Sequence, residues 1–285
     1  MILAAKRELA DGMTKFLRRA AIVLAVAATA LYAALLVLLY TDQRAMLFVR
    51  GRQARAPDPQ YQVRTLSERD GTRLTVWQAP PAHAVAPVIV FFYGNAGTLS
   101  DFARIGETFL DQGYGVVLAS YRGYSGNNGS PSEAGLMTDA RTVLSALAAG
   151  HGPVILWGQS LGTGVAARMA SEGRGALLIL QSPYTSVADV AARRFPVFPV
   201  HWLMRDPFDT YSLLPKITVP VLIMSGTVDR TVPFDMGETL AQRFGAKATF
   251  VPFPGEGHEL SEAGVQAVAA KWLRAQRSRF RARPG

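Results

Sequence analysis

Residues 154–170 read VILWGQSLGTGVAARMA and contain the pentapeptide G-x-S-x-G at 158–162. The run VILW has the length and composition of a buried strand, and the residues after Ser160 have the composition of a helix. Between a strand and a helix, this pentapeptide forms a tight, strained turn that projects the serine hydroxyl at the end of the sheet. Ser160 is therefore the predicted nucleophile. The alternative is a glycine-rich turn in which the serine only caps the helix.

Apolar, β-rich runs recur at regular intervals on both sides of this turn. Continuous apolar runs are typical of parallel strands buried on both faces. Because helix-like segments separate these runs, the sequence predicts right-handed crossovers and an α/β fold, a mainly parallel sheet flanked by helices. A hairpin at a sheet edge is predicted before the first run. The predicted strands are 61–68, 73–79, 88–93, 115–120, 154–158, 176–181, 221–225 and 248–253, and the predicted helices are 100–112, 132–149, 161–172, 234–244 and 261–279.

Residues 20–40 form an uncharged, apolar stretch. A transmembrane helix needs about 20 mostly apolar residues, so this stretch is long enough to cross a bilayer. A cleaved signal peptide is the alternative, since residues 28–30 (Ala-Thr-Ala) fit a cleavage site, but the apolar run continues well beyond them. The predicted organisation is a basic tail (1–19), a transmembrane helix (20–40), a juxtamembrane linker (41–60) and a catalytic domain (61–285) with a small lid-like insertion (182–219).

The charges beside the apolar stretch bear on its orientation. Five Lys/Arg residues precede it and four follow it before residue 60. Under the positive-inside rule this small difference favours a cytoplasmic N-terminus. We therefore expect a single-pass protein of the cell membrane, with a slight preference for a catalytic domain on the non-cytoplasmic side.

Charge and composition exclude several classes of protein. The net charge of +9 is concentrated at the two ends, because residues 61–270 carry fifteen Lys/Arg against seventeen Asp/Glu. A nucleic-acid reader carries its positive charge on the folded domain, so no nucleic-acid partner is predicted, and the basic ends suit an anionic membrane surface. The chain has no cysteine and four scattered histidines, so no metal site is predicted. Residues 162–167 loosely match a dinucleotide fingerprint but lack the acidic residue that should follow, so no cofactor is predicted.

A serine nucleophile needs a general base. In enzymes built on this turn, an acid and then a histidine follow the serine along the chain. Two histidines follow Ser160. His201 lies in a segment rich in proline and aromatic residues, whereas His258 lies in a glycine-rich loop after the last predicted strand. Loops at the carboxyl ends of parallel strands are where ligands bind, so His258 is the predicted base.

The acid that orients the base is predicted by the same reasoning. Asp229 follows the strand at 221–225 and therefore lies at the same edge of the sheet. Asp235 is placed to open the next helix, where it favours the helix dipole. Glu256 is too close in sequence to His258 to orient it. Asp229 is therefore the predicted third member of a triad.

Two backbone N–H groups are predicted to form an oxyanion hole, which stabilises the charge of a tetrahedral intermediate. One belongs to Leu161, the residue after the nucleophile. The other belongs to Asn95, in a glycine-rich loop that follows the strand at 88–93. Glycines in this loop would let the backbone approach a substrate closely.

Several motifs match together, in order, and the chain resembles the membrane-tethered Bem46-like branch of the α/β-hydrolase superfamily. The resemblance covers nearly the whole chain, including the N-terminal anchor, and implies the triad Ser160, Asp229 and His258. The family usually has histidine at the position of Tyr93, which leaves the geometry of the oxyanion loop open. The matching motifs are FYGNAG (92–97), SYRGYSGNNGSPSE (120–133), GQSLG (158–162), QSPYTS (181–186), SGTVDRTVP (225–233) and GEGHEL (255–260).

Together these features predict a serine hydrolase of the carboxylesterase or thioesterase type, which forms an acyl-enzyme on Ser160. A membrane tether suits a lipidic substrate. Four aromatic residues of the insertion are candidates to line an acyl pocket, or else they pack the insertion onto the core: Phe195, Phe198, Trp202 and Phe208. Two other functions stay open, a serine peptidase or amidase with the same triad and a catalytically silent membrane adaptor. The fold implies no particular substrate, and the oligomeric state is not predicted.

Overall fold

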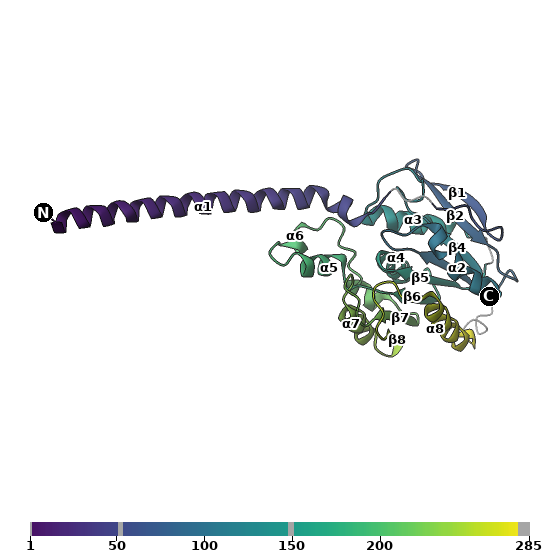
Figure 1. Ribbon diagram of the computed structural model, residues 1–285. Helices are drawn as coiled ribbons and strands as arrows, with labels where there is room; N and C mark the ends of the chain where they lie inside the picture. The colour runs from purple at the N-terminus through teal and green to yellow at the C-terminus, as the bar shows by residue number, and fades with distance from the viewer. Residues whose placement is uncertain (1, 51–53, 148–150, 279–285) are drawn as a thin grey trace. The chain divides into compact units, whose positions relative to one another are not determined.

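The computed structural model describes residues 2–50, 54–147 and 151–278, and it divides into two compact units, residues 1–43 and 44–285 (Figure 1). The first unit is helical and forms most of α1 (Ile2–Leu47). Within α1, Asp11–Leu47 contains an 18-residue window with a mean hydropathy of 2.7, none of which is buried. This helix therefore has the length and composition of a membrane span.

Helix α1 is longer at both ends than the predicted transmembrane helix. Residues 2–19, predicted as a basic tail, and 41–47, predicted as the start of a linker, are helical. Alanine, leucine, arginine, lysine and glutamate dominate residues 2–19, and all of them favour a helix. Because adding residues to an existing helix is far easier than nucleating one, the apolar span extends into its flanks.

The second unit is built on an eight-stranded sheet in the order β1-β2-β4-β3-β5-β6-β7-β8. Strands β3 to β8 are parallel, whereas β1 and β2 form an antiparallel hairpin at one edge and β2 pairs antiparallel with β4. The predicted α/β class is confirmed, with every strand boundary within one residue. The strands are β1 (Gln62–Ser67), β2 (Arg73–Ala79), β3 (Val88–Phe92), β4 (Gly115–Ala119), β5 (Val154–Gln159), β6 (Leu177–Gln181), β7 (Val221–Gly226) and β8 (Ala248–Phe253).

Helices cover both faces of the sheet, since every residue of β3 to β7 is buried. Helix α5, helix α6 and the 3-10 turn η1 occupy the stretch 182–219 between β6 and β7. The predicted helix ends at 148–149 and 279 lie outside the described residues. The helices of the second unit are α2 (Leu99–Leu110), α3 (Glu133–Ser145), α4 (Leu161–Ser171), α5 (Val187–Arg194), α6 (Val200–Leu203), α7 (Phe234–Phe244) and α8 (Glu262–Ala275), with 3-10 turns η1 (Tyr211–Lys216) and η2 (Gly245–Lys247).

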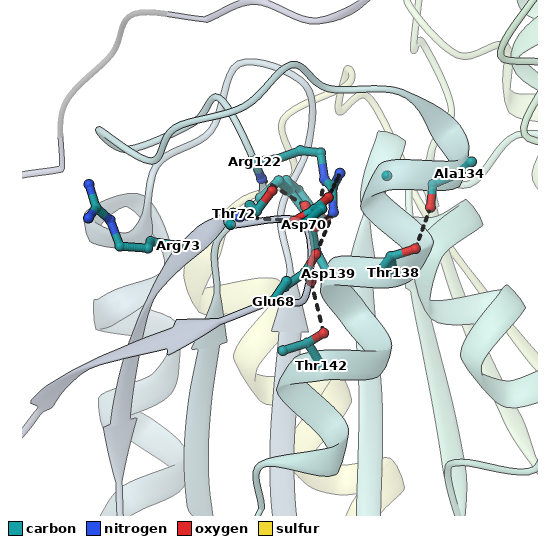
Figure 2. A network of polar contacts seen from close by, with 12 residues as sticks. Glu68, Asp70, Thr72, Arg73, Arg122, Ala134, Thr138, Asp139 and Thr142 are labelled. Carbon is teal, nitrogen blue, oxygen red and sulfur yellow. Dashed lines mark hydrogen bonds and ion pairs between the residues drawn. The ribbon is translucent and has the colours of Figure 1, made fainter.

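An ion-pair network ties the β1–β2 hairpin to α3 (Figure 2). Arg122, which follows β4, lies 2.7 Å from Asp139 of α3 and 2.6 Å from Glu68. It also donates to Asp70 at 3.1 Å, so three carboxylates share one guanidinium. Thr142 donates to Glu68 at 2.8 Å. Burial raises the pKa of Asp139 to about 6, although the contacts with Arg122 lower it.

The topology gathers several loops at one edge of the sheet. Because β3, β5, β6, β7 and β8 are parallel, the segments that follow them all leave from the same edge. These segments contain the glycine-rich loop at 93–97, Ser160, the insertion, Asp229 and His258. The carboxyl edge of a parallel sheet is where α/β proteins bind ligands.

Candidate active site

Ser160 occupies the sharp turn between β5 and α4, with φ 49° and ψ −120°. A positive φ is uncommon for a residue other than glycine and costs free energy. Close packing explains the two glycines of the motif. A Cβ at Gly158 would collide with the carbonyl of Gly162, and a Cβ at Gly162 would collide with the carbonyl of Phe92. The turn therefore needs both glycines to hold Ser160 in this conformation.

The structure brings Ser160, His258 and Asp229 into one hydrogen-bonded chain. His258 Nε2 lies 2.9 Å from Ser160 Oγ, and His258 Nδ1 lies 2.8 Å from Asp229 Oδ2. A carboxylate can only accept, so Nδ1 donates to it and Nε2 is left to accept the serine proton. The other oxygen, Asp229 Oδ1, accepts the N–H groups of Thr231 and Val232 at 2.8 and 2.9 Å. Both oxygens of the buried carboxylate are therefore fixed.

The histidine and the two acids that were the alternatives to His258 and Asp229 have other partners. His201 is exposed and lies 3.7 Å from Asp189 of α5. Asp235 forms a two-bond ion pair with Arg193, at 2.8 and 2.6 Å. Glu256 accepts from the backbone and the hydroxyl of Ser261. None of the three is hydrogen-bonded to Ser160.

The glycine-rich loop and the start of α4 lie beside Ser160, as an oxyanion hole requires. A Cβ at Gly94 would lie 3.2 Å from the Cβ of Ser160, so the loop backbone passes close to the nucleophile. Leu161 is the first residue of α4, and the first N–H groups of a helix have no acceptor within the helix. The side-chain amide of Asn95 donates to the carbonyl of Leu47 at 3.1 Å, which holds this residue in place.

Comparison with known proteins shows the family of the chain. Residues 87–203 match the model of the alpha/beta hydrolase fold, and residues 200–276 match a model described as TAP-like protein. An uncharacterised protein of Mycobacterium tuberculosis, Rv2307c, is 34% identical over 195 residues, which cover 67% of this chain and 69% of that one. The chain belongs to the α/β-hydrolase family.

Relatives with named activities are also similar to this hydrolase. The lysophosphatidylserine lipase ABHD12 of Xenopus tropicalis is 34% identical over 178 residues, covering 54% of this chain and 46% of the lipase. The same lipase of Danio rerio is 31% identical over 237 residues, covering 66% of this chain and 62% of the lipase. The hydrolase thus matches about half of one lipase and less than two thirds of the other. These lipases, together with the fold, support a hydrolase of the ester type.

Solved esterase structures share the fold. The Pyrococcus furiosus esterase Pf2001 superposes with a TM-score of 0.63 at 15% identity, covering 80% of this hydrolase and 97% of the esterase. Propionate-bound Est2 of Thermogutta terrifontis also gives a TM-score of 0.63, at 23% identity and with the same coverage. At these identities the likeness shows the fold alone.

Tyr93, which stands where the family usually has histidine, is accommodated by a buried polar cluster. Its hydroxyl lies 2.9 Å from Ser120 Oγ, and the side-chain amide of Asn127 donates to Ser120 Oγ at 3.0 Å. Its carbonyl accepts from the hydroxyl of Tyr121 at 3.1 Å. Burial raises the pKa of Tyr93 to about 12, so the phenol stays neutral at physiological pH. Both ends of Tyr93 are thus held by hydrogen bonds.

A pocket of about 350 Å³ opens beside Ser160 and His258. It extends past the glycine-rich loop towards Phe102 of α2 and Val265 of α8. Gln159 donates to Glu259 at 2.9 Å within its wall. Its lining residues, all among those that the structure describes, include no Lys or Arg. The lining is Gly94, Asn95, Ala96, Gly97, Asp101, Phe102, Ile105, Gln159, Ser160, Gln181, Thr231, His258, Glu259, Leu260, Glu262 and Val265.

Of the two alternatives for the four aromatic residues of the insertion, lining an acyl pocket does not hold for this pocket, because none of them is among its lining residues. Phe208 is 1% exposed and packs on Phe48, with ring centroids 6.3 Å apart. Trp202 instead is 90% exposed. The alternative, packing onto the core, therefore holds for Phe208 and not for Trp202.

Ser182 supports the site and was not predicted. It follows β6 with φ 52°, and its hydroxyl donates to the carbonyl of His258 at 2.9 Å. This bond links the loop that carries the histidine to the end of β6. The motif QSPYTS contains Ser182, but nothing in the sequence indicates that its partner lies 76 residues away.

Proposed function

We propose that this chain is a serine hydrolase that cleaves carboxylic esters or thioesters through an acyl-enzyme on Ser160. The observation that carries the proposal is the hydrogen-bonded chain from Asp229 through His258 to Ser160. In this arrangement the imidazole is correctly oriented to take the serine proton, and the carboxylate stabilises the imidazolium that forms. The lysophosphatidylserine lipases among the relatives and the pocket beside Ser160 support the same reaction.

The proposed reaction has two halves. As His258 Nε2 takes the hydroxyl proton, Ser160 Oγ bonds to the acyl carbon and forms a tetrahedral intermediate. The N–H groups of Asn95 and Leu161 stabilise its oxyanion. When the intermediate collapses, His258 gives its proton to the departing alcohol or thiol. Water then attacks the acyl-enzyme with His258 again as the base, and the free acid leaves.

We also propose that α1 anchors the hydrolase in a membrane as a single uncleaved span and that the substrate is a lipidic acyl ester. The apolar window of α1 and its lack of burial support the anchor. The lysophosphatidylserine lipases among the relatives support a lipid ester. Retention of the full-length chain in the membrane fraction after alkaline extraction is the expected result, and release into the supernatant would contradict the anchor.

A fluorophosphonate probe, which reacts with activated serines and not with ordinary ones, tests the serine mechanism. We expect wild type to be labelled, Ser160→Ala to lose labelling, and His258→Ala and Asp229→Asn to react at least about 100-fold more slowly. The matched controls are His201→Ala and Asp235→Asn, because these rivals lie outside the hydrogen-bonded chain. A folded wild type that is not labelled, or labelling that survives Ser160→Ala, would overturn the proposal.

A further inference from the structure

The segment 193–205 combines apolar and basic side chains without an acid. It reads RRFPVFPVHWLMR, with three arginines, one histidine and no Asp or Glu. It lies between β6 and β7, from the end of α5 to just beyond α6. The next residue in the chain, Asp206, does not offset this charge on the surface, because its side chain is 3% exposed and pairs with Arg44 at 2.6 Å.

Two large apolar side chains of this segment are turned to the solvent. Trp202 is 90% exposed and Val197 is 70% exposed, while the other three tryptophans are 3%, 1% and 7% exposed. Tryptophan normally buries most of its large surface. The same side chains do not line the pocket at Ser160. The segment therefore presents the side chains of Val197 and Trp202 to the solvent.

We propose that residues 193–205 form a docking tip that inserts Val197 and Trp202 into the interfacial region of an anionic bilayer. Tryptophan favours this region, because its ring is apolar and its N–H group can stay hydrated. Arginines beside the apolar residues are attracted to anionic lipid headgroups. Arg194 is exposed at the end of α5, whereas Arg193 forms an ion pair with Asp235.

A bilayer fits the docking tip better than a second copy of the chain. The proposal of a docking tip depends on the proposal that α1 is a membrane anchor, because chain connectivity then keeps the catalytic domain next to a bilayer. The insertion also leaves the sheet at the carboxyl end of β6, the same edge from which the segments with Ser160 and His258 leave. Docking there places the pocket near the surface in which a lipid ester resides.

The absence of cysteine from the chain allows a single-site test. Val197→Cys and Val85→Cys, each labelled with an environment-sensitive fluorophore, compare two valines of similar exposure, 70% and 76%. Val85 precedes β3 and so lies at the opposite edge of the sheet. The full-length protein is reconstituted in vesicles of phosphatidylcholine and phosphatidylglycerol. Quenching by a nitroxide-labelled lipid is then compared with quenching by aqueous iodide.

We expect the label at 197 to be quenched by the nitroxide lipid and protected from iodide, and the label at 85 to show the reverse. Combining Val197→Cys with Arg194→Glu should weaken lipid quenching, whereas combining it with Lys271→Glu, a charge reversal on α8, should not. High salt should have the same effect as Arg194→Glu, because it screens the charges. Flotation of the protein with the vesicles reports on the α1 anchor alone.

Two results would overturn the docking tip. If iodide quenches both labels equally, the segment stays in water. If the label at 197 is protected from both quenchers, protein covers the segment, and the occupant is a second copy or another part of the chain.

Discussion

Two buried tyrosine hydroxyls bond to the backbone of the segments that carry the proposed oxyanion donors. Tyr121 donates to the carbonyl of Tyr93 at 3.1 Å, two residues before Asn95. Tyr184 donates to the carbonyl of Leu161 at 2.9 Å, on the residue whose N–H group is the other proposed donor. An oxyanion hole works only when its donors are held in place before the reaction. Each tyrosine is therefore placed to fix one donor.

Replacing either tyrosine by phenylalanine should slow the reaction without weakening substrate binding. We expect Tyr121→Phe and Tyr184→Phe to lower kcat roughly 10- to 100-fold with KM nearly unchanged, since the oxyanion exists only in the transition state. Tyr61→Phe is the matched control, because Tyr61 is also buried and donates to a backbone carbonyl, that of Ala103, at 2.9 Å. Steady-state kinetics on a soluble ester checks this. Equal losses in all three variants would show that these bonds serve stability alone.

The residues of the proposed triad could be found from the sequence, but those that hold them could not. Ser160 lies in a motif with a mechanical meaning, and Asp229 and His258 follow apolar strands in the expected order. Ser182 and Tyr184, by contrast, act through backbone atoms of distant residues. Such contacts leave no local pattern, because they depend on where the chain folds back.

The last turn of α1 and the residue after it belong to the catalytic unit. Arg44 pairs with the buried Asp206 at 2.6 Å, and Phe48 is 1% exposed against Phe208. The carbonyl of Leu47 accepts the side-chain amide of Asn95 at 3.1 Å. The residues that end the proposed anchor helix therefore also support the proposed oxyanion loop.

Soluble forms of the hydrolase should differ according to where they begin. A chain that starts at residue 44 keeps these contacts, whereas one that starts at residue 54 loses all three. We expect the shorter chain to lose roughly 3–5 kcal/mol of stability from Phe48 alone, and at least about 10-fold in kcat because Asn95 is no longer held. Chemical unfolding and kinetics on a water-soluble ester measure the two effects. Equal activity of the two chains would show that Leu47 has no role in the site.

The same region shows why some elements could be predicted and others not. The central strands were predicted to within one residue, because burial on both faces requires an unbroken apolar run. Residues 41–47 resemble a linker in composition, and their place in the structure depends on the tertiary contacts of Arg44 and Leu47. In the insertion, Phe208 and Trp202 are both aromatic, yet one is buried and the other exposed. Composition alone could not separate them.

The stability of the whole catalytic unit should depend on pH through the network at Arg122. Its central carboxylate, Asp139, has a pKa raised by burial to about 6, against an ordinary value of 3.8. Between these two values the folded chain holds a proton that the unfolded chain releases. The free energy of unfolding therefore falls as pH rises through this interval. A shift of about two units corresponds to about 3 kcal/mol.

Asp139→Asn isolates this contribution, because an amide does not titrate. Relative to wild type, the variant should gain up to about 3 kcal/mol in unfolding free energy between pH 4 and pH 7, measured by urea denaturation. Asp235→Asn is the control, because its effect on the pH dependence of the unfolding free energy should have the opposite sign. The hydrogen bonds from Arg193 lower the pKa of Asp235, so wild type loses that contribution as pH falls, and only weakly, since the pair is exposed. The unfolding free energies of the two variants, relative to wild type, could instead change in the same direction with pH. Asp139 would then not be held as a protonated acid near pH 5, and its ion pair with Arg122 would fully offset the effect of burial on its pKa.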